Sequence, residues 1–145
     1  MVEGGEPQIG QIVDHHFLWA DEDAAGQVEG RKPRPCVIIA VERRRDAAPR
    51  VTVLPITSQP PRAGATTVAI PDDVKARIGL DRARPAWVVV DDANMFFWPG
   101  FDLVPQRGGG FVRALVTRGF FARIRDAVLA VHSRGRPRII RRDEK

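Results

Sequence analysis

The sequence contains little cysteine and no long apolar run, and each shortage excludes a class of protein. Its one cysteine, Cys36, cannot form a disulfide within the chain, which fits a protein of the reducing cytosol. No segment approaches the roughly 20 consecutive apolar residues that are needed to cross a bilayer. The first residues, Met1 to Pro7, are acidic and glycine-rich, unlike a secretory signal. We therefore expect a cytoplasmic protein without a membrane segment.

Histidine is also scarce, and its placement argues against a metal site. His15 and His16 are adjacent, so in a strand they point to opposite faces and cannot chelate one ion together. No cysteines or histidines stand in pairs at the spacing of metal ligands. The run Gly108-Gly109-Gly110 is not followed by the Gly-Lys-Ser/Thr of a phosphate-binding loop. We expect neither a metal nor a cofactor.

Lysine is rare among the basic residues, which are almost all arginine. Only three of the 23 basic residues are lysine, so 20 are arginine, and the formal net charge is +5. Guanidinium groups bind phosphates through paired donors, so this composition suits a polyanionic partner. A GC-rich genome, which favours arginine codons, explains it equally well. Charge alone indicates a polyanion or an acidic partner without choosing between them.

Short apolar segments separated by polar, glycine- and proline-rich stretches predict a mainly β chain. The segment before residue 36 is a long polar loop, and residues 42–50 form a charged hairpin loop. Strands are expected at residues 9–19, 36–41, 51–56, 66–70, 86–91 and 103–105.

One convincing helix follows near the end of the chain. It begins after Thr117, the expected N-cap, carries apolar residues at every fourth position from Phe120, and ends at Gly135. A shorter helical turn is capped by Asp72 and stopped by Gly79. We expect one domain over residues 1–145, with a core of about 9–132 and flexible tails at 1–8 and 134–145. The fold class is a small, strongly bent β barrel with the C-terminal helix packed on one side.

Two short motifs carry a resemblance to a known family. Arg34-Pro35 stands before the apolar strand 36–41, and Pro55-Ile56-Thr57-Ser58 ends the next strand. In this order and at this spacing, over about residues 9–132, the chain resembles the MazF/PemK toxins, also called growth inhibitors. The resemblance implies an SH3-like barrel, usually a homodimer, and a sequence-selective endoribonuclease that cleaves single-stranded RNA without a metal. It also implies an acidic antitoxin protein that covers the active groove.

Arg34 is the first candidate for the chemistry of RNA cleavage. When the 2′-hydroxyl attacks the adjacent phosphorus, a fixed cation must stabilise the charge that develops on the phosphorane. Pro35 restricts Arg34 to extended backbone, so its guanidinium is held in place before substrate arrives. In the family the matching arginine is catalytic. The ordinary structural alternative is a surface arginine beside a strand.

Thr57 and Asp91 complete the predicted catalytic set. The resemblance makes Thr57 catalytic or phosphate-positioning, whereas its structural alternative is a hydroxyl that bonds its own turn. Asp91 matches an acidic position that some relatives use. A carboxylate beside a guanidinium has a lowered pKa and is a weak base, so orienting Arg34 is the role that suits Asp91 better. Asp92 is the competing residue.

A second group of residues is predicted to contact RNA. Arg31 and Lys32 would bind phosphates or lie in a solvated loop, and Ser58 would share the task of Thr57 or cap the turn. We assign Gln59 to the same RNA-binding group. Trp98 would stack on a base, as would Trp19, because single-stranded RNA exposes its bases to aromatic side chains. Core or interface positions suit Phe96 and Phe97 better.

Two departures from the family leave the general base open. Val89 stands where some relatives carry an arginine, and no histidine lies near Gln27 or Glu29, where some relatives have one. The alternative function is therefore a non-catalytic barrel module that binds nucleic acid or protein. A toxin that acts on DNA gyrase through its helix ranks last, because that activity does not use the Arg-Pro and Pro-Ile-Thr-Ser motifs.

Overall fold

The computed structural model describes residues 5–20, 32–61, 63–135 and 138–142. Within these ranges the chain forms eight strands and two helices, so the predicted mainly β fold with a C-terminal helix is confirmed. The strands are β1 (Gln11–His16), β2 (Pro33–Arg44), β3 (Ala47–Thr57), β4 (Thr67–Ala69), β5 (Trp87–Val89), β6 (Asp92–Phe97), β7 (Val112–Leu115) and β8 (Arg138–Arg141). The helices are α2 (Asp72–Arg77) and α3 (Arg118–Arg134).

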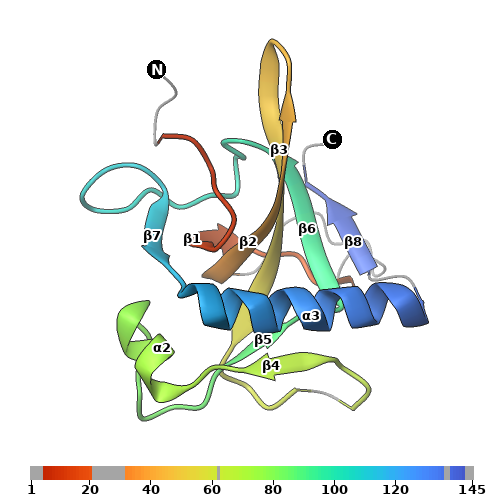
Figure 1. Ribbon diagram of the computed structural model, residues 1–145. Coiled ribbons are helices and arrows are strands. Elements are labelled where there is room, and N and C mark those ends of the chain that lie inside the picture. The colour runs from red at the N-terminus through yellow and green to blue at the C-terminus, as the bar shows by residue number, and fades with distance from the viewer. Residues whose placement is uncertain (1–4, 21–31, 62, 136–137, 143–145) are drawn as a thin grey trace.

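The strands form one sheet in the order β4-β5-β3-β2-β1-β7, and β6 pairs with both β3 and β8. Strand β3 pairs with β2 as far as Pro55 and then with β5 through Ile56 and Thr57, which lets the sheet curve. Helix α3 lies across one face of this sheet (Figure 1). In the described part of the chain β4 and β7 are not paired with each other. The sheet is therefore open, and the word barrel describes only its curvature.

Both faces of the sheet are buried, because neighbouring residues of a strand point to opposite sides. Ile12 of β1 joins the cluster that packs against Phe120 and Ile124 of α3. Val13, the next residue, joins a second cluster that contains Phe96. None of these residues has more than 4% of its surface exposed. Two cores back to back hold the strand ends between them in fixed positions.

The helix boundaries agree with the sequence signals except at one cap. The Thr117 hydroxyl accepts a hydrogen bond from the Phe120 backbone N–H at 3.2 Å, so the predicted N-cap of α3 is confirmed. Gly79, just after α2, has φ of 77°, the left-handed conformation that glycine adopts without strain. Asp72 does not cap α2: the N-cap position is Pro71, and Asp72 is the first helical residue. No helix among the described residues has the length and apolar character needed to span a membrane.

The hairpin of β2 and β3 is longer than predicted. Its strands continue through the charged segment that we expected to be a loop, and only Arg45 and Asp46 form the turn. Asp46 has φ of 57°, a conformation that aspartate tolerates better than most residues. The hairpin extends beyond the rest of the sheet (Figure 1). Its two strands satisfy each other's backbone, so they need no apolar face.

The end of the chain is not the predicted free tail. Strand β8 pairs in parallel with β6, and Arg142 is buried with its guanidinium 2.8 Å from the Asp102 carboxylate. At the other end, the carbonyl of Gly5 accepts a hydrogen bond from the Trp98 indole N–H. Residues 138–142 and Gly5, which we expected in flexible tails, thus make defined contacts with the rest of the fold. The expected strand at 103–105 is reduced to a single bridge between Leu103 and His15.

Candidate functional site

The fold brings the two motifs of the resemblance to the same end of one hairpin. Cys36 of β2 pairs with Pro55 of β3 in the last antiparallel pair before the strands separate. Arg34 and Thr57 each lie two residues beyond this pair, at the end of the hairpin opposite its turn. Past the pair, β2 continues along β1, where Arg34 pairs with His15, and β3 continues along β5, where Thr57 pairs with Trp87. The fold thus brings both residues to the same end of the hairpin.

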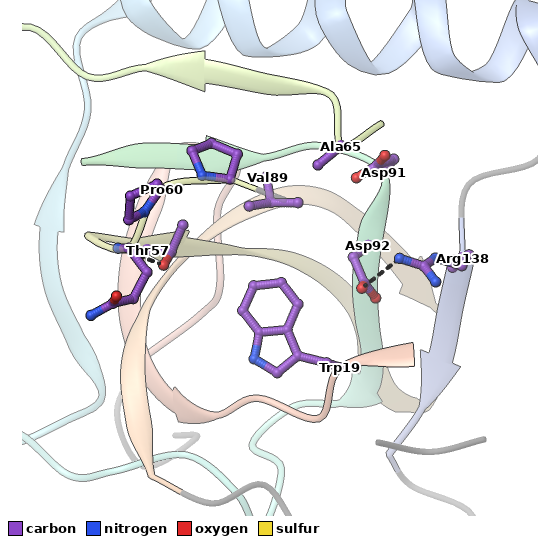
Figure 2. A pocket seen from close by; sticks show the side chains of 10 residues that line it. Trp19, Thr57, Pro60, Ala65, Val89, Asp91, Asp92 and Arg138 are labelled. Carbon is purple, nitrogen blue, oxygen red and sulfur yellow. Dashed lines mark hydrogen bonds and ion pairs between the residues drawn. The ribbon is translucent and has the colours of Figure 1, made fainter. Parts of the chain in front are cut away.

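A cavity of about 330 Å³ opens beside Thr57 (Figure 2). Its walls are largely apolar and include an indole, and acidic side chains and one arginine close one end. The residues that line it include Trp19, Thr57, Pro60, Val89, Asp91 and Arg138. An apolar slot with a few polar groups at its edge is the usual form of a ligand site.

Thr57 is almost buried and already makes one local hydrogen bond. Thr57 is 8% exposed, and its Oγ1 accepts a hydrogen bond from the Gln59 backbone N–H at 3.1 Å. This is the hydrogen bond within its own turn that the sequence allowed as the alternative to a catalytic role for Thr57. A hydroxyl that accepts still has its own O–H to donate. The turn therefore fixes the oxygen of Thr57 while leaving the proton free for a ligand in the cavity.

Arg34 contacts the indole that lines this cavity. Its guanidinium carbon lies 5.2 Å from the ring centroid of Trp19, a cation–π contact. The Nε of Arg34 is buried and has no hydrogen-bond partner among the described residues. A buried donor without a partner is costly unless something accepts from it. The arginine is thus held in place by the indole, and its buried Nε has a donor that none of the described residues uses.

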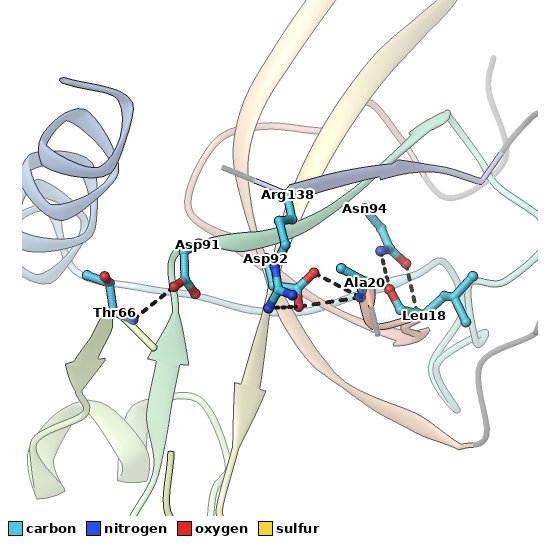
Figure 3. Close-up of polar contacts among 7 residues, drawn as sticks. All are labelled: Leu18, Ala20, Thr66, Asp91, Asp92, Asn94 and Arg138. Atoms are coloured by element: carbon cyan, nitrogen blue, oxygen red, sulfur yellow. Dashed lines mark hydrogen bonds and ion pairs between the residues drawn. The ribbon is translucent and has the colours of Figure 1, made fainter. Parts of the chain in front are cut away.

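Strand β6 holds the backbone on both sides of Trp19 (Figure 3). Asn94 accepts from the Leu18 N–H at 3.0 Å and donates to the Leu18 carbonyl at 2.8 Å. Asp92 accepts from the Ala20 N–H and lies 3.4 Å from the Arg138 guanidinium. These two buried side chains fix the path of residues 18–20 and therefore the position of the indole. No sequence motif marks Asn94 or Arg138 for this role. The only signal near Asn94 is the group of aromatic residues that follows it in the chain.

Asp91 lines the cavity but does not contact Arg34. One carboxylate oxygen accepts from the Thr66 N–H at 3.1 Å, and the other is buried without a hydrogen-bond partner in the described part of the chain. The predicted role of orienting Arg34 therefore has no contact to support it. Asp92, the competing residue, is 1% exposed and serves the backbone of Ala20.

His15 is placed where it cannot act on a substrate. Its Nε2 lies 3.1 Å from the Asn94 amide oxygen, and its ring stacks on Phe96 at 4.9 Å. Burial lowers the pKa of His15 to about 4, with a smaller contribution from the positive charge of Arg142, while the bond to Asn94 opposes the shift. The ring is therefore neutral at pH 7 and belongs to the core.

A second cavity, of about 270 Å³, is lined by Arg34 itself. Lys32, Arg34, Ser58 and Arg84 line it, so it is far more basic than the first. Arg84 donates to the Ser58 hydroxyl at 3.1 Å. Consecutive residues of the Thr57-Ser58 motif thus face different cavities, because a strand alternates its side chains.

Three of the five predicted RNA-binding residues divide between the two cavities. Gln59 lies with Thr57 and Asp91 in the first cavity, and Lys32 lies with Ser58 in the second. Trp98 is 2% exposed and packs in the core, so the prediction that it stacks on RNA is wrong. Arg31 lies outside the described residues. Among those described, no group of three or more histidine, cysteine, aspartate or glutamate side chains is placed to hold a metal ion.

Comparison with known families gives the class of this protein. The family model described as "PemK-like, MazF-like toxin of type II toxin-antitoxin system" matches residues 15–96, more than half of the chain. No curated protein shows significant similarity to the chain. The match contains Arg34, Thr57 and Asp91 together with the strands that carry them. The chain therefore belongs to the PemK-like, MazF-like toxin family, and membership implies an antitoxin protein as partner.

Proposed function

We propose that this toxin is an endoribonuclease that cleaves single-stranded RNA at selected sequences, with Arg34 and Thr57 at the reacting phosphate. The observation that supports the proposal is that both residues lie at the same end of the β2–β3 hairpin, with Thr57 in the cavity walled by Trp19 and Arg34 stacked on that indole. Family membership supports the toxin role, and the activity of this chain is our inference from it.

The proposed reaction uses the 2′-hydroxyl of the RNA as its nucleophile. The 2′-oxygen bonds to phosphorus, the bond from phosphorus to the 5′-oxygen breaks, and one proton leaves the 2′-oxygen while another reaches the 5′-oxygen. The products are a 2′,3′-cyclic phosphate and a 5′-hydroxyl. The nucleophile belongs to the substrate, so the protein need not activate a water molecule.

Arg34 and Thr57 act on the charge that develops at phosphorus. The non-bridging oxygens of the phosphorane are more negative than those of the starting diester, so a fixed cation and a fixed O–H bind the transition state more tightly than the substrate. Trp19 holds the guanidinium of Arg34 from one side, and the Gln59 N–H holds the oxygen of Thr57. Donors fixed before substrate arrives need no reorganisation during the reaction.

The first cavity accounts for the single-stranded substrate. Trp19 offers a flat face and Pro60 and Val89 offer apolar walls, which suit an unstacked base. Asp91 is the acidic side chain that the edge of such a base would meet. A base held in a duplex remains stacked between its neighbours and cannot enter. Val89 also stands where some relatives carry an arginine, and this keeps a non-catalytic RNA-binding module as the second candidate function.

The test is cleavage by the purified full-length chain in the presence of EDTA. We expect cuts in a mixed-sequence single-stranded RNA, with cyclic phosphate at one new end and 5′-hydroxyl at the other, identified by end-labelling and mass spectrometry. The same RNA annealed to its complement should stay intact. Binding of the single strand with no cuts in any sequence would reject the nuclease and leave the binding module.

A further inference from the structure

Of the three arginine–proline pairs in the sequence, Arg34-Pro35 and Arg84-Pro85 line one cavity together. Arg84-Pro85 precedes β5 in the same way that Arg34-Pro35 precedes the apolar part of β2, and all four residues line the cavity of about 270 Å³. We propose that Arg84, together with Ser58 and Lys32, binds a backbone phosphate of the RNA next to the phosphate held by Arg34. This inference rests on the proposed function and adds a binding site to it.

The loop that presents Arg84 is fixed from below by a buried cation. Lys75 of α2 is 4% exposed, and its ammonium donates to the carbonyls of Arg84 at 2.8 Å and Arg82 at 3.2 Å. It also lies 3.0 Å from the Asp72 carboxylate. A buried ammonium is costly unless it is fully partnered, and here its partners are the loop itself. Pro85 further restricts the backbone of Arg84, so the guanidinium starts from a rigid base.

The charges around this cavity favour an anion. Three cationic side chains, those of Lys32, Arg34 and Arg84, line it against the one carboxylate of Asp81 among the described lining residues. That carboxylate accepts from the Ala83 N–H at 2.9 Å and so is tied to its own loop. The local charge is positive even with this carboxylate included.

The hydrogen-bonding groups match a phosphate in particular. Arg84 uses one N–H to hold the Ser58 hydroxyl at 3.1 Å, which leaves the Ser58 O–H and the remaining guanidinium donors for a ligand. A guanidinium presents two parallel N–H groups to two oxygens of one phosphate. A serine hydroxyl beside it supplies a third donor. The cavity therefore offers donors and positive charge in the arrangement that a diester requires.

The two cavities together give the RNA a path across the strand end. Thr57 lines the Trp19 cavity and Ser58 lines the Arg84 cavity, and Arg34 connects them because it lines the second and stacks on Trp19 of the first. A single strand that places one base beside Trp19 and its scissile phosphate at Arg34 meets Arg84 with a neighbouring phosphate. Arg84 is thus assigned to substrate binding, and Arg34 to the chemical step.

The experiment measures binding of an RNA that cannot be cut. The probe is a short single strand that contains a mapped cut site, blocked by 2′-O-methylation there, with one uncharged methylphosphonate placed at each linkage in turn. Arg84→Ala is compared with Arg82→Ala, a matched control because Arg82 is an exposed arginine of the same loop that does not line the cavity. Thermal unfolding of both variants checks that the loop change leaves the fold intact.

We expect Arg84→Ala to weaken binding about tenfold, whereas Arg82→Ala changes it little. The salt dependence of log K should lose about 0.7 in slope, the value for one phosphate contact to a single strand. The wild type should be sensitive to one particular uncharged linkage beside the cut site, and Arg84→Ala should be insensitive to that linkage alone. Arg84→Lys should recover part of the affinity, since it restores a charge without the paired donors.

Equal affinities of Arg84→Ala and Arg82→Ala would overturn the inference. So would loss of affinity for polyglutamate with RNA affinity retained, because the cavity would then fit an acidic protein segment. A wild-type chain that cuts no RNA removes the proposed function and this inference with it. If the wild type cuts RNA but Arg84→Ala keeps the same sensitivity to each uncharged linkage, the inference about Arg84 fails and the proposed nuclease function stands.

Discussion

The two ends of the β2–β3 hairpin both carry arginine, yet only one of them has the features of a candidate site. At the tip, Arg43 pairs with the exposed Glu6, and Arg44 lies over the Phe97 ring at 4.4 Å. At the base, Arg34 is flanked by prolines, stacks on the Trp19 of one cavity and lines the other. The tip uses its cations on neighbouring surface groups. At the base, the buried Nε of Arg34 has no hydrogen-bond partner among the described residues. A charge has its largest effect where water is excluded.

This contrast answers the question that composition left open. An arginine-rich sequence fits both a phosphate-binding surface and a GC-rich genome, and counting arginines cannot separate the two. The structure separates them by what each guanidinium contacts. The hairpin tip therefore serves as an internal control for its base.

The largest expected difference is in the chemical step. Arg34→Ala should lower the cleavage rate by a factor of about 10²–10³, the usual cost of removing one fixed donor to a transition-state oxyanion. Arg45→Ala, at the turn of the same hairpin, should leave the rate within about twofold because surface positions away from the site contribute little. Single-turnover cleavage of one defined RNA measures both. A normal rate for Arg34→Ala would remove that residue from the site.

The second prediction concerns pH and the core beneath the base of the hairpin. Burial holds the pKa of His15 at about 4, below the 6.5 of an exposed histidine. Protonation also places a buried N–H at Nδ1, which has no hydrogen-bond partner among the described residues. The unfolded chain therefore binds the proton more readily, and stability is complete above pH 6.5 and falls as the pH drops towards 4. The full loss is about 3 kcal/mol.

Chemical denaturation of the wild type and of His15→Gln between pH 4 and pH 7 tests this prediction. The variant should be less stable at neutral pH but should lose less stability on acidification. Parallel pH profiles for the two chains would show that other groups cause the acid sensitivity. Hairpin charges at the tip are exposed and should not contribute to the difference.

Sequence patterns predicted the parts of the fold that are stabilised locally. The strand around Val37 and Ile38 was predicted from a continuous β-branched run, and α3 from its period and the cap at Thr117. Strand β8 was missed because Ile139 and Ile140 stand among arginines and look like a solvated tail. It is held by pairs such as Arg138 with Asp92, which are 46 residues apart, and a sequence does not show such pairing.

For the candidate site, too, local sequence patterns pointed to some residues and missed others. The two motifs located Arg34 and Thr57, but Arg84 was overlooked although it carries the same Arg-Pro pattern as Arg34. Trp98 was overrated because an aromatic beside Pro99-Gly100 looks exposed, whereas it is buried between sheet and loop. Local sequence shows which residue types are present. Which cavity each one reaches depends on how the curved sheet is paired.

The third prediction tests whether Trp19 stacks on an RNA base, in contrast to an apolar side chain elsewhere on the surface. Trp19→Ala should weaken RNA binding by about tenfold, since one base–aromatic stack contributes roughly 1–3 kcal/mol. Trp19→Phe should retain most of the affinity and most of the cleavage rate, because it keeps a ring beneath Arg34. Leu129→Ala on α3, which is 60% exposed, serves as the control and should bind normally. Equal losses for Trp19→Phe and Trp19→Ala would contradict a stacking role.

The smallest expected effect belongs to the tip, and it completes the comparison. The Glu6 and Arg43 side chains are 60% and 56% exposed, so their ion pair is screened by solvent. Exposed pairs contribute about 0–1 kcal/mol, and Glu6→Gln should change the free energy of unfolding within that range. The difference should vanish at high salt, and RNA cleavage should be unaffected. A loss of cleavage comparable to that of Arg34→Ala would mean that the tip takes part in the reaction, because a weak surface pair has no other route to the chemical step.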